Sequence, residues 1–315
     1  MPGRPIGFFY IEKMALSKKD KTVLIIAGPT AVGKTAIAIQ VAKSLHTEIV
    51  SADSRQCFKE LVIGVARPSA EEMKSVKHHF IASHSIKEEV TAITFEQYAL
   101  QIVADLFQHH DTVVMTGGTG LYIKAFCEGL DAIPGIPMDI RASINKKYGK
   151  DGLAWLQQEL EKKDPQFYKE GEMQNPQRMM RALEVVEATG NSILDFRKGE
   201  KKQRPFTIKK IGLELPRNEL QERINTRVDQ MMEAGLLEEV KALLPFKDLN
   251  ALQTVGYAEI VEFLEKKTTL AKALDAIKIH TRQYAKRQMT WFKKDQEIEW
   301  FSPDNPDLIL SAAKI

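Results

Sequence analysis

The sequence predicts an α/β protein in which a parallel β-sheet is flanked by helices and interrupted by an all-helical domain. Three observations predict this class. Short, uninterrupted apolar runs of strand length alternate with longer segments that place apolar residues at helical spacing. A glycine-containing loop directly follows the first of these runs. In the middle of the chain, about 70 residues carry helical patterns only.

Length and composition set the outer limits. The chain has 315 residues, enough for one large core and a smaller second unit, and is 43% hydrophobic and 28% charged, as is usual for globular proteins. No apolar run approaches the roughly 18 residues of a membrane span, so we expect no membrane association. Cys57 and Cys127 are too few for a disulfide framework or a zinc site, which suits the cytoplasm. We expect residues 1–20, basic and broken by prolines, to form a disordered extension.

The first predicted strand, Val23–Ala27, leads into a loop and then a helix with apolar residues at helical spacing. Strand, glycine loop and helix in this order are typical of a phosphate-binding loop, and hence of a P-loop NTPase-like sheet. The loop amides, the lysine and the helix N-terminus attract phosphate, and the Thr35 hydroxyl is a candidate Mg²⁺ ligand. We expect the loop to bind a diphosphate or triphosphate through the residues Gly28, Pro29, Thr30, Ala31, Val32, Gly33, Lys34 and Thr35.

Asp53 follows a second predicted buried strand, residues 48–52. Since the carboxyl ends of parallel strands share one edge of the sheet, Asp53 should face the phosphate loop. A carboxylate there can hold Mg²⁺ through water or accept a proton from a substrate. It can also simply cap the next helix.

A third strand, Thr112–Thr116, ends in a glycine turn that brings the Thr119 hydroxyl to the same edge. No acid ends this strand, which argues mildly against ordinary ATPase chemistry. Between these elements, we interpret His78 and His79 as structural or as polar contacts near the substrate, because adjacent residues do not face one metal site. Arg67, in a turn, is available to phosphate or to a partner.

The helical patterns of residues 135–207 predict an inserted domain, a lid or arm within a core of residues 21–134 and 208–315. The core resumes with a strand at 207–215, continues as helices and ends in a short strand near residue 300. Arg223 and Arg227 lie four residues apart on one helix and suit a diphosphate, although nearby glutamates can pair with them.

Net charge is only +3, but nine basic residues and one acid lie between Lys266 and Lys294. In the predicted last long helix, Lys278, Arg282 and Lys286 recur every four residues, opposite an apolar side that includes Tyr284, Gln288 and Trp291. A second basic cluster lies at 197–210. Such clusters on a nearly neutral chain suggest a polyanion-binding face, with solvated helix faces as the equally weighted alternative.

Six motifs, in order along the chain, together resemble the tRNA dimethylallyltransferases, also called tRNA isopentenyltransferases. They are GPTAVGKT at 28–35, SADSRQ at 51–56, GGTGLY at 117–122, NPQRMMRALE at 175–184, VGY at 255–257 and TRQYAKRQMTWF at 281–292. Cys57, Phe58, Val62 and Val65 depart from the residues usual in that family. With no cysteine after Cys127, the chain lacks the zinc module of many eukaryotic members and looks like the bacterial type.

The resemblance implies a transferase that moves a dimethylallyl group from its diphosphate to the exocyclic amine of the adenosine 3′ to the tRNA anticodon, with Mg²⁺. It implies that Asp53 is the general base, that Lys34, Thr35 and the loop amides hold diphosphate and Mg²⁺, and that Arg223 binds diphosphate. It further implies contacts with the tRNA anticodon stem-loop, and a target base flipped out of its stack. The residues it implies for tRNA contact are Asp53, Ser54, Arg55, Gln56, Thr119, Arg141, Gln177, Arg178, Arg181, Gly256 and Tyr257.

We expect a monomer. A small-molecule kinase, a prenyltransferase acting on free AMP and a non-catalytic nucleic-acid-binding protein are the alternatives. The intact Lys34, Thr35 and Asp53 argue against the non-catalytic protein. Neither a kinase nor an AMP enzyme needs the helical insertion and the basic last helix.

Overall fold

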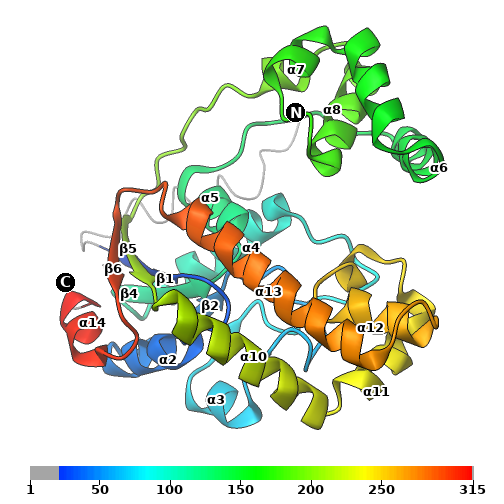
Figure 1. The fold of residues 1–315 in the computed structure, drawn as a ribbon. Helices are drawn as coiled ribbons and strands as arrows, with labels where there is room; N and C mark the ends of the chain where they lie inside the picture. Colours follow the sequence, from blue (N-terminus) through cyan, green and yellow to red (C-terminus); the bar gives the residue numbers. More distant parts are fainter. Residues whose placement is uncertain (1–20, 314–315) are drawn as a thin grey trace. The chain divides into compact units, whose positions relative to one another are not determined.

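The computed structural model describes residues 21–313. The predicted extension at 1–20 therefore lies outside the described residues. The chain divides into two compact units, shown with their elements in Figure 1. One comprises the described residues up to Cys127 and from Gln203 onward, and the other is Glu128–Lys202. The sequence placed the insertion at 135–207, so its limits differ from those of the compact unit by a few residues at each end.

The larger unit is built on a parallel sheet of six strands in the order β3-β2-β4-β1-β5-β6. This confirms the predicted α/β class with a parallel sheet. The strands are β1 (Thr22–Ala27), β2 (Ile49–Ser51), β3 (His78–His79), β4 (Thr112–Gly117), β5 (Thr207–Leu213) and β6 (Ile298–Phe301). β1 is buried along its whole length and is central in the sheet, with β4 and β5 paired to it on either side.

Helices connect these strands and cover the sheet. In the first half of the unit they are α2 (Lys34–Ser44), α3 (Ala70–Ser75), α4 (Ala92–Leu106) and α5 (Gly120–Glu128). In the second half they are α10 (Arg217–Glu233), α11 (Leu236–Leu243), α12 (Tyr257–Leu264), α13 (Leu270–Phe292) and α14 (Pro306–Ala313), with short 3₁₀ turns η1 (Leu244–Phe246) and η2 (Asn250–Leu252). α13 packs against both α10 and α12 (Figure 1).

The core beside the phosphate loop consists of aliphatic side chains from the sheet and from α2. Leu24 and Ile26 of β1, Ile37 and Val41 of α2 and Ile309 of α14 belong to it, all nearly inaccessible to solvent. Each buried side chain of this size stabilises the folded state by about 1.5–3 kcal/mol relative to the same side chain left exposed to water. The packed core fixes where β1 ends and α2 begins, and thereby the ends of the loop between them.

The smaller unit contains four helices, α6 (Met138–Lys163), α7 (Pro165–Glu170), α8 (Pro176–Thr189) and α9 (Ile193–Phe196). Gly152 interrupts α6 with a φ of 71°. Buried Asp164 ties two of the connections together, since it accepts hydrogen bonds from the Phe167 amide and from the Ser192 hydroxyl, both at 2.9 Å. These helices enclose their own apolar core, which includes Leu156 and Leu183.

The region that the sequence left unassigned, residues 57–94, is largely loop, with α3 and the two-residue β3. His79 Nε2 lies 2.5 Å from Glu48 Oε2, and His78 Nδ1 lies 2.8 Å from the Val76 carbonyl oxygen. Both histidines thus have structural contacts at the sheet edge, the first of the two roles expected. Within residues 21–313 there is no cluster of His, Cys, Asp and Glu suited to hold a metal by itself, and no helix is long and apolar enough to cross a membrane.

Candidate active site

The phosphate loop contains three residues with positive φ angles, two of which are glycines. Gly28 has a φ of 150° and Gly33 a φ of 102°, in the region that favours glycine. A Cβ on Gly28 would lie 2.7 Å from the Leu213 carbonyl oxygen, so the residue must also be small. Ala31, which is not glycine, also has a positive φ, 65°. Gly33 is the N-cap of α2 and supplies no side-chain oxygen, so the first-turn amides of that helix remain open to an anion.

Lys34 extends over this loop, and its Nζ donates to the Pro29 carbonyl oxygen at 2.7 Å. Burial lowers the pKa of Lys34 from 10.5 to about 8; the Asp53 carboxylate opposes this shift, and Arg227 adds to it. A cation that is poorly solvated and close to another cation gains strongly from a bound anion. The lysine side of the pocket is therefore suited to diphosphate.

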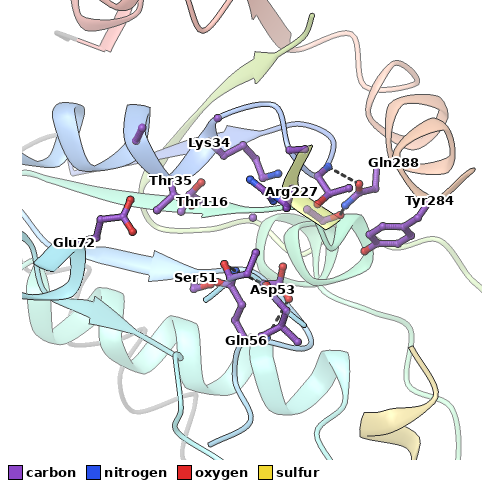
Figure 2. Close-up of a pocket in the computed structure, with 18 residues that line it drawn as sticks. Lys34, Thr35, Ser51, Asp53, Gln56, Glu72, Thr116, Arg227, Tyr284 and Gln288 are labelled. Carbon is purple, nitrogen blue, oxygen red and sulfur yellow. Dashed lines mark hydrogen bonds between the residues drawn. The ribbon is translucent and has the colours of Figure 1, made fainter. Parts of the chain in front are cut away.

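Asp53 lies across the pocket from Lys34, two residues after the end of β2 (Figure 2). Its Oδ1 accepts the backbone amides of Arg55, at 2.9 Å, and Gln56, at 3.2 Å. One oxygen of Asp53 thus caps the turn that follows, as the alternative interpretation of the sequence had it. Asp53 also lines the pocket, as expected for a residue at the carboxyl end of a parallel strand. The two hydrogen bonds from these amides hold the carboxylate in one orientation.

The two arginines of α10 do not share one position. Arg227 lines the pocket beside Lys34, and within residues 21–313 it has no hydrogen-bonding or ion-pair partner. Burial lowers its pKa. Arg223 lies on the outer side of the loop near Gly33, where it pairs with Asp304 at 3.2 Å rather than with the neighbouring glutamates. Arg227 is thus the arginine inside the pocket, and Arg223 flanks the loop from outside; the prediction that Arg223 binds the diphosphate stays a prediction.

Two adjoining cavities meet at Asp53. The first, of about 240 Å³, is lined by the phosphate loop, Lys34 and Thr35. The second, of about 490 Å³, is lined by α10, α12 and α13 and includes apolar residues such as Ile224 and Val228. The residues common to both linings are Thr30, Asp53, Val65, Ala66, Arg227 and Tyr284. The site therefore joins an anion-binding end to a larger, partly apolar end, with a carboxylate between them.

The pocket wall also offers oxygen ligands for a hard cation. Thr35, Ser51 and Thr116 carry hydroxyls there, and Asp53 and Glu72 carry carboxylates. Mg²⁺ binds oxygen, keeps several waters and usually shares its coordination with substrate phosphates. The residues present fit such an ion.

Residues of the Asp53 turn contact neighbouring loops. Thr119 Oγ1 accepts the Ser54 amide at 3.1 Å, and Gln56 Nε2 donates to the carbonyl oxygens of Val65 and Ala66 at 3.2 and 3.0 Å. The Arg55 guanidinium donates to Asn250 Oδ1 at 3.2 Å. Of these, Ser54 and Arg55 line the second cavity, as does Gly256.

Two residues singled out in the sequence have structural contacts in the loop beside the pocket. Tyr257 is fully buried, and its hydroxyl donates to Glu239 at 2.5 Å, so its side chain is a structural one, while the predicted tRNA contact of the stretch around Gly256 and Tyr257 stays a prediction. Glu239 also accepts the amides of Val62, Ile63 and Gly64 and so holds the loop beside the pocket. Arg67 Nη2 donates to the carbonyl oxygens of Phe58, Lys59 and Leu61, so this part of the guanidinium has a structural contact; the expectation that Arg67 serves a phosphate or a partner stays a prediction.

The basic residues of α13 are not one uniform solvent-facing stripe. Lys278 pairs with Asp229 at 2.6 Å, and Arg282 donates to Asn225 Oδ1 at 3.0 Å, because α10 lies alongside. Lys286 is exposed. The next residue, Arg287, lines the second cavity, with its guanidinium carbon 5.8 Å from the centre of the Tyr284 ring.

In the helical unit, the predicted contact residues lie near one another on α6 and α8. Arg141 and Arg181 both pair with the buried Glu184, at 3.5 and 3.0 Å, while Arg178 pairs with Glu172. Gln177 is exposed at the start of α8. Of the four departures noted above, Cys57 and Phe58 are buried, whereas Val62 is 44% exposed and Val65 lines both cavities.

Sequence reasoning assigned Gln288 and Tyr284 only to the packing side of the last helix. Both line the first cavity (Figure 2). Burial of the Tyr284 hydroxyl raises its pKa to about 12. The sequence does contain a sign of the role of Gln288, because it places a glutamine among the apolar positions of an amphipathic helix. A buried side-chain amide requires hydrogen-bond partners.

Comparison with known proteins agrees with this site. The sequence model for IPP transferase matches residues 56–295. A tRNA dimethylallyltransferase of Bacteroides thetaiotaomicron is 43% identical over 294 residues, covering 93% of this chain and 96% of that protein.

Solved structures agree as well. The tRNA isopentenylpyrophosphate transferase of Bacillus halodurans has a TM-score of 0.68 and 34% identity over 93% of this chain and 95% of its own. A eukaryotic dimethylallyltransferase acting on tRNA has a TM-score of 0.69 and 26% identity, covering 86% of this chain and 69% of its own. The chain belongs to the IPP transferase family.

Proposed function

We propose that this protein transfers a dimethylallyl group from dimethylallyl diphosphate to the N6 amine of the adenosine 3′ to the anticodon, adenosine 37, in tRNA. The products are N6-isopentenyladenosine in tRNA and diphosphate. The observation that carries the proposal is the meeting of the two cavities at Asp53, Arg227 and Tyr284. A diphosphate in the loop pocket would place its allylic chain at that junction, within reach of a base entering from the larger cavity.

The chemistry matches the groups at the junction. The lone pair of the adenine amine attacks the first carbon of the dimethylallyl group, and the carbon–oxygen bond breaks with its electrons leaving on diphosphate. Lys34, Arg227 and the first-turn amides of α2 stabilise the negative charge that develops on the leaving group. The amine is a weak nucleophile, so Asp53 accepts its proton as the new bond forms.

We further propose that Thr35 holds Mg²⁺ in the first cavity, with Asp53 as a ligand through water. The ion would neutralise charge on the diphosphate. We propose Gly28, Pro29, Thr30, Ala31, Val32 and Gly33 as the remaining diphosphate cradle, with Arg223 approaching its outer side.

The tRNA anticodon arm needs more surface than the two cavities provide. We propose that Ser54, Arg55, Gln56, Thr119 and Gly256 lie around the flipped base. The helical unit would contact the stem-loop through Arg141, Gln177, Arg178 and Arg181, and α13 would add Lys286 and Arg287. The protein would act as a monomer in the cytoplasm, where its tRNA substrates are.

The test is an incubation with Mg²⁺, labelled dimethylallyl diphosphate and unmodified tRNA that has adenosine at positions 36 and 37. We expect label in the tRNA, recovered after digestion as N6-substituted adenosine. The same tRNA with guanosine at position 37 is the matched control and should stay unlabelled. Label in free AMP, or ATP consumption without labelled tRNA, would contradict the proposal in favour of the AMP enzyme or the kinase.

A further inference from the structure

Gln288 of α13 joins two segments of the active site that are far apart in the sequence. Its Oε1 accepts the backbone amide of Thr30 in the phosphate loop, and its Nε2 donates to the Gly118 carbonyl oxygen after β4, both at 2.8 Å. The side chain is only 7% exposed, and both bonds lie at the wall of the first cavity (Figure 2). The carboxamide thus uses both of its functions at once, one as acceptor and one as donor.

The fit of this side chain is close. A Cβ on Gly118 would lie 2.2 Å from Gln288 Nε2, so the amide rests directly on the glycine backbone. Ala285, about one turn before Gln288 on α13, packs in a small apolar cluster with Ala31 and Ile224, which brings α13 against the same loop. Shape and hydrogen bonding therefore both specify a glutamine here.

The bond to Thr30 lies next to the strained residue of the loop. Ala31 has a φ of 65°, a conformation that costs a residue with a Cβ about 1 kcal/mol or more and persists only where surrounding contacts enforce it. Because the Thr30 amide points to Gln288, it is not among the amides available to a phosphate. The contact therefore sets which amides of the loop face the cavity.

We propose that Gln288 is a positioning residue that holds the phosphate loop in its diphosphate-binding shape, with Thr30 turned toward α13 and the α2 end of the loop open. This inference rests on the proposed function for the identity of the anion. Its physical basis is that a flexible loop must otherwise be ordered when the ligand binds, at a cost in affinity. Gln288 removes that cost in advance.

The test compares binding of inorganic diphosphate, with Mg²⁺, to the whole protein by calorimetry. Gln288→Met keeps the length and shape of the side chain but neither hydrogen bond, and we expect about 10-fold to 100-fold weaker binding. Gln288→Glu keeps an acceptor but places a negative charge against the Gly118 carbonyl and the bound anion, so binding should weaken further. Gln283→Met, at an exposed position on the same helix, should bind like the wild type.

Hydrogen exchange separates positioning from general stability. The Thr30 amide should exchange faster in Gln288→Met, while amides of β1 and β4 keep their protection. Equal diphosphate affinity of Gln288→Met and wild type, or unchanged Thr30 exchange, would overturn the inference. Should Gln288→Met fail to fold, Gln288→Leu, which is apolar and also makes neither hydrogen bond, supplies the same comparisons. Failure of the wild type itself to bind diphosphate would instead contradict the proposed function.

Discussion

The charge state of Lys34 makes the affinity for dimethylallyl diphosphate depend on pH in a calculable way. In the free protein, burial lowers the pKa of Lys34 from 10.5 to about 8, against the attraction of Asp53 and with repulsion from Arg227. That shift corresponds to about 3 kcal/mol of unfavourable free energy for keeping the ammonium charged at neutral pH. A bound diphosphate stabilises the ammonium and raises this pKa again.

The sign follows from proton counting. Below pH 8 Lys34 is charged before and after binding, so its affinity contribution is constant. Between pH 8 and the higher pKa of the complex, binding must take up a proton, and affinity falls up to tenfold per pH unit. Stability of the free protein changes oppositely: between pH 8 and 10.5 only the unfolded chain keeps this proton, so the group's contribution rises with pH.

Calorimetric titration with dimethylallyl diphosphate at pH 7, 8 and 9 tests this. Relative to pH 7, we expect about tenfold weaker binding at pH 9, with nearly one proton taken up per ligand. The ligand's phosphates are already ionised above pH 8, and Tyr284, whose pKa is raised to about 12, does not titrate in this window. Lys34→Arg stays charged and should show no such decline. A flat wild-type profile, or the same decline in Lys34→Arg, would show that the charge of Lys34 does not set this pH dependence.

Three further predictions concern contacts outside the phosphate pocket. Tyr257→Phe removes the buried hydrogen bond to Glu239 and should lower the free energy of unfolding, measured by urea titration, by about 1–3 kcal/mol. Tyr168→Phe, at an exposed position, should leave this free energy unchanged. Lost tRNA affinity with unchanged stability of Tyr257→Phe would instead indicate that the Tyr257 hydroxyl contacts tRNA directly. Asp164→Ala removes the cap of α7 and the hydrogen bond from Ser192, and should destabilise the helical unit by about 2–4 kcal/mol, measured by hydrogen exchange. Unchanged protection of the amides in this unit would contradict a stabilising role of Asp164. Lys286→Ala should reduce the steepness of log tRNA affinity against log salt concentration by about one. Lys278→Ala should reduce it by less, because Lys278 is already paired with Asp229. Equal effects of the two substitutions would contradict the assignment of Lys286 alone to tRNA phosphate.

Much of the larger unit could be predicted because its signals are local. The apolar run of β1, the glycines of the loop and the helical spacing after Lys34 are adjacent in the sequence, and the structure has strand, loop and helix there. Asp53 could be placed by the rule that parallel strands end at one edge. Its capping bonds and its place in the cavity both follow from that position.

What could not be predicted depends on docking between distant segments. Arg223 and Arg227 share a helix face, but one turn moves a side chain about 6 Å along the axis, and only Arg227 enters the pocket. The motif around Tyr257 indicated a functional residue, yet burial against Glu239 makes its role structural. The sequence alone indicated no ion-pair partner for Lys278, whereas in the structure Asp229 of α10 pairs with it.

In the proposed mechanism, Asp53 accepts the proton of the attacking amine at the junction of the two cavities. Asp53→Asn isolates this role, because asparagine can still accept hydrogen bonds from the Arg55 and Gln56 amides through its oxygen but is no base. We measure single-turnover transfer of dimethylallyl to tRNA, together with the affinities for tRNA and diphosphate. We expect transfer to slow by about 10²- to 10⁴-fold, with both affinities near those of the wild type. Transfer at close to the wild-type rate would contradict this role.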